Sequence, residues 1–381
     1  MCRSENEYVN YTLIDQNSQL AAVCEQARRH DAVALDTEFV RTRTYYPQLG
    51  LIQLFDGEQL VLIDPLNISD WAPFVALLQD THVTKFLHAS GEDLEVFLHR
   101  FKCLPNPMID TQVLAAFAGQ PLSWGFAAMV NHFNQIELDK SESRTDWLAR
   151  PLTERQCVYA AADVAYLLPI AHQLMEQTEA AGNMAAALSE CDNLCQRRLD
   201  VLQPEDAWRD ITNAWQLRPR QLAALQRLAA WRLNIARQKD MAVNFVVREE
   251  NLWKVARFMP GSLGELDHLG LNGHEIRFHG KAMVALVAEA QAQDESTLPQ
   301  PLPNLIDHPH YKQAFKAIKA LVLQVSEETG FSQELLASRR QINQVLSVYW
   351  GLKSGCRTPE LLTGWRGELL QKRIDEILQA L

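Results

Sequence analysis

Long apolar runs are missing from this 381-residue chain, because no stretch approaches the roughly 18 apolar residues of a membrane-spanning helix. The first ten residues, MCRSENEYVN, also lack the apolar core of a secretory signal peptide. None of the seven cysteines forms a Cys-x-x-Cys pair. These absences argue against a transmembrane protein, a disulfide framework and a zinc site, and they predict a protein of the reducing cytoplasm.

The composition is that of an ordinary globular protein, with 47% hydrophobic and 22% charged residues. Its length exceeds what one hydrophobic core usually supports, which predicts two or three domains. The net charge of −11 is unevenly distributed, since residues 1–207 carry 14 basic and 29 acidic side chains and residues 208–290 carry 12 and 8. This asymmetry fits an acidic, metal-binding catalytic unit beside a module that tolerates polyanions.

Strand-like and helix-like segments alternate over the first 180 residues and predict a mixed α/β sheet with helices on its faces. The predicted strands are Tyr11–Ile14, Val33–Phe39, Leu51–Phe55, Leu60–Ile63 and Val83–Leu87, with Asp56-Gly57 as a hairpin turn. The predicted helices are Ser18–Arg29, Trp71–Leu78, Glu92–Phe101, Asp110–Ala118, Trp124–His132 and Thr153–Gln177, with Asp110 and Thr153 as N-caps.

Strand signals disappear from about Val201 onward, and two helical segments follow, Trp208–Ala290 and Pro303–Leu381. A polar, proline-rich linker, Gln291–Pro303, separates them. Phe245–Ala256 aligns loosely with Leu335–Leu346, which indicates a degenerate repeat of one small helical domain. The sequence therefore predicts three domains, over residues 1–200, 208–290 and 300–381.

Four acids and one tyrosine are spaced so that folding can bring them together. Asp36 and Glu38 lie two apart on a strand and therefore share a face, and Tyr159 and Asp163 lie four apart on a helix and do the same. Asp93 follows another apolar run, in a loop between strand and helix. Carboxylates placed this close repel one another unless cations lie between them, so the pattern predicts a divalent-metal site.

Each of these features also has an ordinary structural explanation. Asp36 and Glu38 could lie at a strand end and reach solvent, and Asp93 could be a first-turn acid stabilised by the helix dipole. Tyr159 and Asp163 could make a structural hydrogen bond. The combination and its order carry more weight than any one of them.

The order Asp-x-Glu, Asp, Tyr-x-x-x-Asp resembles the tyrosine-bearing branch of the DEDD superfamily of 3′→5′ exonucleases. Within that superfamily, Ala34–Phe39, the loop Leu138–Trp147 and Tyr159–Asp163 are similar to the ribonuclease D family, and the two helical segments resemble HRDC domains. The resemblance covers nearly the full length. It implies an α/β ribonuclease-H-like exonuclease domain, a mixed sheet flanked by helices, followed by two small all-α HRDC-like domains.

The resemblance implies two divalent metal ions, Mg²⁺ or Mn²⁺, as cofactors. It implies that Asp36 bridges both ions, that Glu38 and Asp163 complete the site of the attacking water, and that Asp93 helps to hold the second ion. Tyr159 would align that water. The implied activity releases 5′-mononucleotides from RNA with a single-stranded 3′ end, tRNA precursors being the suggested substrate. No obligate protein partner and no membrane association are implied.

Substrate contacts are predicted from side chains around these acids. Phe39 could wedge between terminal bases or belong to the core, and Lys140 and Arg144 could contact phosphates or lie in a solvated polar loop. In the first helical segment the resemblance implies nucleic-acid binding. There the arginines of one predicted basic face are Arg218, Arg220, Arg227, Arg232 and Arg237.

Two other functions remain open at this stage. A 3′→5′ DNA exonuclease would use the same metal chemistry, because nothing in these motifs contacts the 2′-hydroxyl. A non-catalytic nucleic-acid-binding scaffold would be expected to have lost one or more of the acids, and none is missing.

Overall fold

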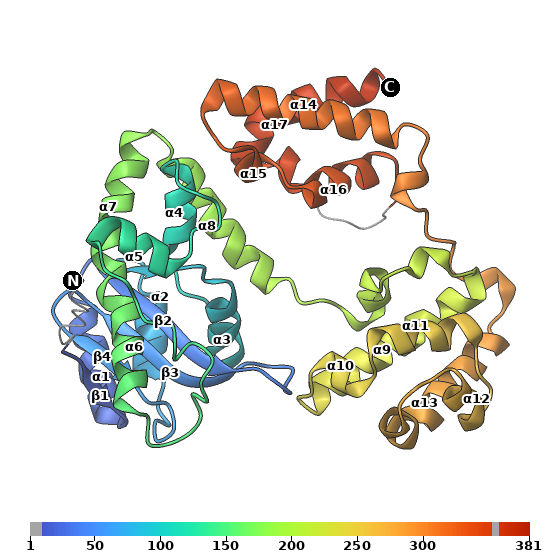
Figure 1. Cartoon of the computed structure of the whole chain (residues 1–381), viewed down its shortest axis with the longest axis horizontal. Helices are drawn as coiled ribbons and strands as arrows, with labels where there is room; N and C mark the ends of the chain where they lie inside the picture. Colours follow the sequence, from blue (N-terminus) through green and yellow to red (C-terminus); the bar gives the residue numbers. More distant parts are fainter. Residues whose placement is uncertain (1–9, 353–357) are drawn as a thin grey trace.

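The computed structural model describes residues 10–352 and 358–381 and consists of an α/β unit followed by two helical units (Figure 1). The α/β unit contains a six-stranded sheet, as the sequence predicts in outline. Its strands are β1 (Thr12–Ile14), β2 (Ala32–Val40), β3 (Gln48–Phe55), β4 (Leu60–Ile63), β5 (Thr84–Leu87) and β6 (Met108–Asp110).

The sheet is mixed, with the strand order β1-β4-β3-β2-β5-β6. The predicted meander is confirmed, because β2, β3 and β4 pair antiparallel in sequence order. The outer strands are parallel to their neighbours: β1 to β4, β5 to β2 and β6 to β5. In the central pair, Asp36 lies opposite Gln53, and the register shifts between Glu38 and Phe39. The acids of β2 thus lie in the middle of the sheet rather than on an edge strand.

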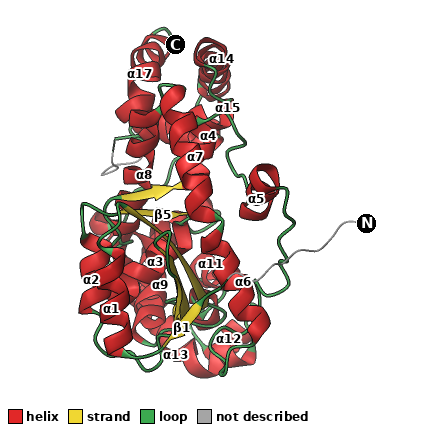
Figure 2. Cartoon of the chain, turned by 90° about the vertical axis from the view of Figure 1, so that its left-hand side faces the viewer, coloured by secondary structure: helices red, strands yellow, loops and turns green. Residues whose placement is uncertain are grey.

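Helices cover both faces of this sheet (Figures 1 and 2). The helices of this unit are α1 (Asn17–Ala27), α2 (Ala72–Gln79), α3 (Gly91–Phe101), α4 (Thr111–Phe117), α5 (Phe126–Asn134), α6 (Glu154–Ala165), α7 (Leu167–Ala180) and α8 (Met184–Leu199). Alternate strand residues face two separate cores: Leu35 and Leu54 pack with α1, α2 and α3, and Leu51 and Phe86 pack with α4, α6 and α7.

The predicted elements differ from the observed ones in three places. The helix predicted over Thr153–Gln177 is interrupted at Tyr166, because Pro169 has no N–H to donate to the carbonyl of Ala165 one turn earlier. The three-residue strand β6 was not predicted, since so short a segment shows no periodicity. Helix α8 was not predicted either. Both predicted N-caps are confirmed, at Asp110 and at Thr153.

Both helical units begin their α-helices with a long helix, a four-residue helix and a helix of ten or eleven residues, in that order. The α-helices are α9 (Pro219–Gln238), α10 (Val243–Val246), α11 (Glu249–Phe258), α12 (Leu263–His268) and α13 (Gly273–Ala292), then α14 (Tyr311–Thr329), α15 (Gln333–Leu336), α16 (Arg339–Tyr349) and α17 (Gly364–Gln379). The aligned segments fall on α10–α11 of the first unit and on α15–α16 of the second, which supports the predicted repeat. Short 3₁₀ helices are η1 (Pro204–Asp210), η2 (Ala214–Gln216), η3 (Glu295–Thr297), η4 (Leu305–Asp307) and η5 (Glu360–Leu362).

The first helical unit contacts the turn between β2 and β3. The amides of Tyr45 and Tyr46 donate to one carboxylate oxygen of Asp240, at 3.0 and 2.9 Å. The amide of Ala242 donates to the carbonyl of Arg43 at 2.7 Å. The second helical unit instead contacts α8, through α17. The α/β unit therefore contacts both helical units, the first through the β2–β3 turn and the second through α8 (Figure 1).

The arginines predicted to form a basic face are mostly structural. Arg232 is buried and donates to the carbonyl of Val247, so its assignment to an exposed face is wrong. Arg220 donates to the carbonyls that end α13, and Arg237 donates to the hydroxyl of Tyr45. These side chains fix the first helical unit and its contact with the α/β unit.

Among the described residues, no helix combines the length and the apolar character that a bilayer crossing requires.

Candidate active site

Three of the predicted acids lie together where α6 packs across the sheet. One carboxylate oxygen from each of Asp36, Glu38 and Asp163 lies within 4.8 Å of the other two. The first two come from the same face of β2, and the third comes from α6. The small buried residues Ala160 and Ala161 allow α6 to approach the strands closely. Local spacing on two elements and their close packing therefore produce the cluster.

Asp93 is not one of these three acids, but it interacts electrostatically with each of them. It occupies the first turn of α3, is buried, and accepts a hydrogen bond from the hydroxyl of Thr37. Thr37 lies between Asp36 and Glu38 on β2. The fourth acid is therefore close enough to interact electrostatically with the other three, while its carboxylate is held by the strand that carries two of them.

All four acids have raised pKa values. Burial, followed by the negative charges of the neighbouring acids, raises the pKa of Asp36 well above its usual range. The same two causes raise the pKa of Glu38 to about 9 and that of Asp163 to about 8. Burial raises the pKa of Asp93 to about 7, against the opposing effect of the hydrogen bond from Thr37. Without a cation the cluster therefore retains protons near neutral pH.

The polar groups around the cluster fit a divalent cation. Gln53 is completely buried, and its amide nitrogen lies 3.4 Å from a carboxylate oxygen of Asp36. Its amide oxygen has no hydrogen-bond partner among the described residues. The carboxylate oxygens of Asp36, Glu38 and Asp163 are the hard ligands that Mg²⁺ or Mn²⁺ prefers.

Tyr159 lies one helical turn before Asp163, and its phenol is kept protonated. Burial, and then the charges of Asp163 and Glu38, raise the pKa of this phenol far above its usual value. Its ring lies 6.1 Å from that of Trp147. A hollow of about 280 Å³ opens beside Tyr159 and Asp163. The hydroxyl is therefore available as a hydrogen-bond donor next to the acids.

The loop before α6 borders this hollow. Lys140 and Arg144 lie on it and are exposed, while Phe39 is half-buried at the irregularity of β2. Arg155 also lines this hollow and was not among the predicted site residues. It donates to the hydroxyl of Ser141 at 3.0 Å and pairs with acids of the same loop. Its position one turn before Tyr159 on the same helix face was the available signal. Contact of Phe39, Lys140 and Arg144 with substrate stays a prediction.

Known proteins match the chain along nearly its whole length. Family models match as a 3′-5′ exonuclease over residues 11–179, as an HRDC domain over residues 221–287 and as the C-terminal HRDC domain of ribonuclease D over residues 309–374. Ribonuclease D of Serratia proteamaculans is 66% identical over 97% of this chain and 100% of its own length. Ribonuclease D of Escherichia coli K12 is 65% identical over 97% of this chain and 99% of its own length.

The chain belongs to the ribonuclease D family. The crystal structure of E. coli RNase D, described as an exoribonuclease involved in structured RNA processing, superposes with a TM-score of 0.96 over 98% of this chain and 99% of that one. The catalytic core of RRP6 from Trypanosoma brucei, at 21% identity and a TM-score of 0.60, shares the fold. The predicted family and fold class are confirmed, and the protein is a 3′→5′ exoribonuclease.

We expect Tyr159→Phe to slow this ribonuclease about 10- to 100-fold, because one positioning hydrogen bond is lost and no carboxylate is removed. The measurement is the single-turnover rate on an RNA oligomer with a free 3′ end. Tyr349→Phe, at an exposed tyrosine of the second helical unit, is the control and should keep the full rate. An unchanged rate for Tyr159→Phe would show that the hydroxyl does not position the reacting water.

Gly50 sets how closely the loop before α6 packs on β3. A Cβ atom at this position would lie 2.6 Å from the carbonyl oxygen of Trp147. Arg150 prevents relaxation, since it donates to the carbonyls of Trp147 and Gly50 at 2.8 and 2.7 Å. We expect Gly50→Ala to lower the free energy of unfolding by about 1–3 kcal/mol.

Denaturant unfolding of purified variants measures the effect of Gly50→Ala. Gly125→Ala is the matched control, because a Cβ there meets no described atom within 4 Å and the backbone φ is −74°. Equal stability of the two variants would contradict the packing argument.

Proposed function

We propose that this ribonuclease shortens structured RNAs, tRNA precursors among them, from a single-stranded 3′ end and releases 5′-mononucleotides. The observation that carries the proposal is the approach of Asp36, Glu38 and Asp163 to within 4.8 Å, next to a protonated Tyr159. The substrate class is supported by the E. coli relative, whose crystal structure is described as that of an enzyme of structured RNA processing.

In this proposal Asp36, Glu38, Asp93 and Asp163 would hold two divalent cations, Mg²⁺ or Mn²⁺, and Asp36 would contribute to both. When bound, the cations activate a water molecule and stabilise the charge that develops on the leaving 3′-oxygen. Asp93 would contribute by turning from Thr37 toward the cluster or through a bridging water. The fit is supported by the raised pKa values, because protons occupy the acids only while cations are absent.

The remaining groups would position the substrate. The hydroxyl of Tyr159 donates to, or accepts from, the water that attacks the terminal phosphodiester, and its raised pKa keeps the donor proton in place. Lys140 and Arg144 would contact backbone phosphates from the loop beside the hollow, and Phe39 would contact the terminal bases.

The domain bounds at residues 1–200, 208–290 and 300–381 remain part of the proposal. The two helical domains would bind the RNA and direct its 3′ end to the exonuclease domain. The cytoplasm as location and the lack of an obligate protein partner remain predictions as well.

A comparison of matched substrates tests the proposal. The full-length protein is incubated with Mg²⁺ or Mn²⁺ and an RNA or DNA hairpin of the same sequence, each with a single-stranded 3′ tail. We expect stepwise loss of 5′-mononucleotides from the RNA tail, arrest near the duplex, and slower digestion of DNA. Digestion of the DNA tail as fast as the RNA tail, or faster, would contradict a preference for RNA, and nucleoside 3′-phosphates as products would contradict the mechanism. The Asp36→Asn variant is the control for a contaminating nuclease, because digestion that persists with this variant would not come from the proposed site.

A further inference from the structure

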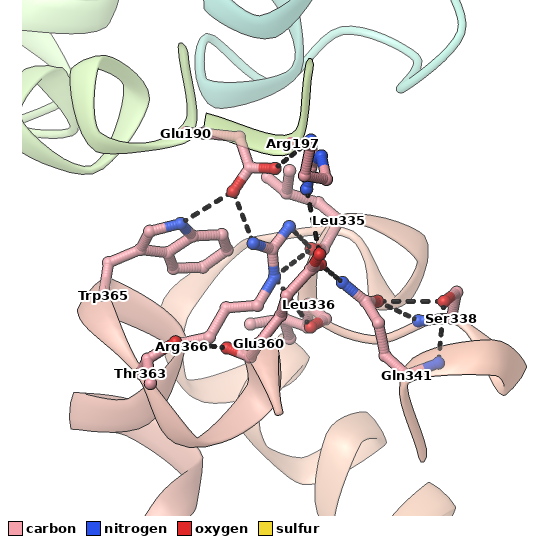
Figure 3. A network of polar contacts seen from close by, with 10 residues as sticks. All are labelled: Glu190, Arg197, Leu335, Leu336, Ser338, Gln341, Glu360, Thr363, Trp365 and Arg366. Atoms are coloured by element: carbon pink, nitrogen blue, oxygen red, sulfur yellow. Dashed lines mark hydrogen bonds and ion pairs between the residues drawn. The ribbon is translucent and has the colours of Figure 1, made fainter. Parts of the chain in front are cut away.

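A buried ion pair joins the second helical unit to the α/β unit (Figure 3). Glu190 projects from α8 toward the guanidinium of Arg366 on α17, and the two side chains form a hydrogen-bonded ion pair. Glu190 is 8% exposed and Arg366 is 6% exposed. The indole N–H of Trp365 donates to the same carboxylate oxygen at 3.3 Å, and Arg197 approaches the other oxygen at 3.5 Å.

Arg366 also makes contacts within the second helical unit. It donates to the carbonyls of Leu335 and Leu336 at 3.0 to 3.2 Å, and its guanidinium lies 4.4 Å from the ring centre of Trp365. Trp365 in turn packs edge-on against Phe117 of α4, with ring centres 5.1 Å apart. A buried ion pair adds little net stability, even with this many hydrogen bonds, because desolvation of its charges is costly. Its geometry nevertheless favours one position of the second helical unit relative to the α/β unit.

The contact continues from α8 toward the acids. Cys191 follows Glu190, and its sulfur accepts a hydrogen bond from the amide of Asp110 at 3.3 Å. Asp110 ends β6 and is 2% exposed. Its carboxylate accepts from the amides of Ala89 and Ser90 at 3.0 and 2.8 Å and from the hydroxyl of Ser90 at 2.8 Å.

The segment that Asp110 holds leads directly into α3. Ala89 has a left-handed backbone with φ of 52°, which is unfavourable for alanine and needs such support. The carbonyl of Ser90 accepts from the amide of Leu94 at 2.9 Å, in the turn that contains Asp93. A second tie runs from Arg198 of α8 to Glu95 of α3 at 3.3 Å.

We propose that the Glu190–Arg366 pair and Asp110 form a relay through which the docked second helical unit sets the position of Asp93. Asp110 is then a positioning residue of the metal site, and the second helical unit is needed to complete that site. This inference rests on the proposed function, because it assumes that Asp93 helps to hold a cation.

Two quantities are measured for each full-length variant. Mn²⁺ binding in the absence of RNA is monitored by electron paramagnetic resonance, and the Mn²⁺ concentration that gives half-maximal exonuclease activity is compared with it. Arg366→Met breaks the pair between the units. Its control is Arg373→Met on the same helix, which removes an ion pair to Glu328 within the second helical unit. Asp110→Asn breaks the support of the segment before α3. Its control is Asp294→Asn, another carboxylate that accepts from a backbone amide, that of Ser296.

We expect Arg366→Met and Asp110→Asn to weaken Mn²⁺ binding about 10- to 100-fold, the range found for residues that orient metal ligands, and to raise the half-maximal concentration in parallel. Both controls should match the wild type. If Arg366→Met does not fold, Ser90→Ala, which removes one donor to Asp110, is expected to weaken Mn²⁺ binding several-fold.

Two failures are distinguishable. If Arg366→Met and Asp110→Asn lower the melting temperature but leave Mn²⁺ binding unchanged, these contacts only stabilise the fold. That result would overturn the proposed relay. In that case an inactive Asp36→Asn would leave the proposed function intact, whereas an active Asp36→Asn would remove the function itself.

Discussion

Asp36→Asn is expected to reduce exonuclease turnover by about three orders of magnitude or more, because the acid shared by both cations is lost. The change keeps the size of the side chain. It also removes an acid whose ionisation is opposed by burial and by its acidic neighbours, so the metal-free variant should be at least as stable as the wild type. Loss of activity and retention of the fold are therefore predicted together.

Single-turnover rates and thermal unfolding of purified Asp36→Asn measure both parts of this prediction. Asp163→Asn should behave in the same way, because it removes another member of the cluster. Asp31→Asn is the control, since Asp31 is exposed just before the same strand and its backbone carbonyl, which the substitution keeps, accepts from the amide of Thr84. Near-normal turnover in Asp36→Asn would refute the assignment of the site.

Cation binding is expected to strengthen steeply with pH, by at least about tenfold between pH 6 and pH 8, because each cation displaces protons from acids with raised pKa values. The relevant values are about 7 for Asp93, about 8 for Asp163 and about 9 for Glu38. Removal of cations with a chelator should abolish activity at every pH in this range.

The same values fix the sign of the effect on stability. Folded-state pKa values above those of the unfolded chain mean that the folded protein binds more protons than the unfolded one. This contribution to the free energy of unfolding is complete below about pH 4 and is lost as the pH rises toward 9. The metal-free protein should therefore lose stability over this range, and added Mg²⁺ or Mn²⁺ should restore more of it at pH 9 than at pH 6.

Melting temperatures with and without cation, measured across pH 6 to 9, test this coupling. In the difference between the two curves, the effects of titrating groups distant from the site cancel. The difference should shrink in Asp163→Asn, which lacks one of the titrating acids. A stabilisation by cation that does not change with pH would mean that the acids are already ionised in the metal-free protein.

Local periodicity predicted much of this site. The two-residue spacing on β2 placed Asp36 and Glu38 on one face, and the four-residue spacing on α6 did the same for Tyr159 and Asp163. The capping residue Asp110 was also predicted correctly as the start of α4. Each of these predictions concerns residues within one element, where backbone geometry alone fixes the relation of the side chains.

Contacts between distant segments were not predictable in this way. Glu190 and Arg366 are 176 positions apart, and neither lies in a pattern that names its partner. Fully buried Lys85 lies in a predicted strand, but its three bonds to backbone carbonyls depend on loops from both sides. The hydrogen bond from Thr37 to Asp93 likewise depends on how α3 docks against β2. Tertiary packing decides such contacts, and a single sequence does not encode it locally.

The proposed chemistry requires that Asp36, Glu38, Asp93 and Asp163 hold two cations at one phosphodiester. Anomalous diffraction from crystals of the full-length protein, grown with Mn²⁺ and a nucleoside 5′-monophosphate, would locate these cations. We expect two manganese peaks about 3.5–4 Å apart, both in contact with Asp36, with the nucleotide phosphate beside them. No manganese at Asp36 under saturating Mn²⁺, or a nucleotide bound away from this cluster, would contradict the proposed chemistry.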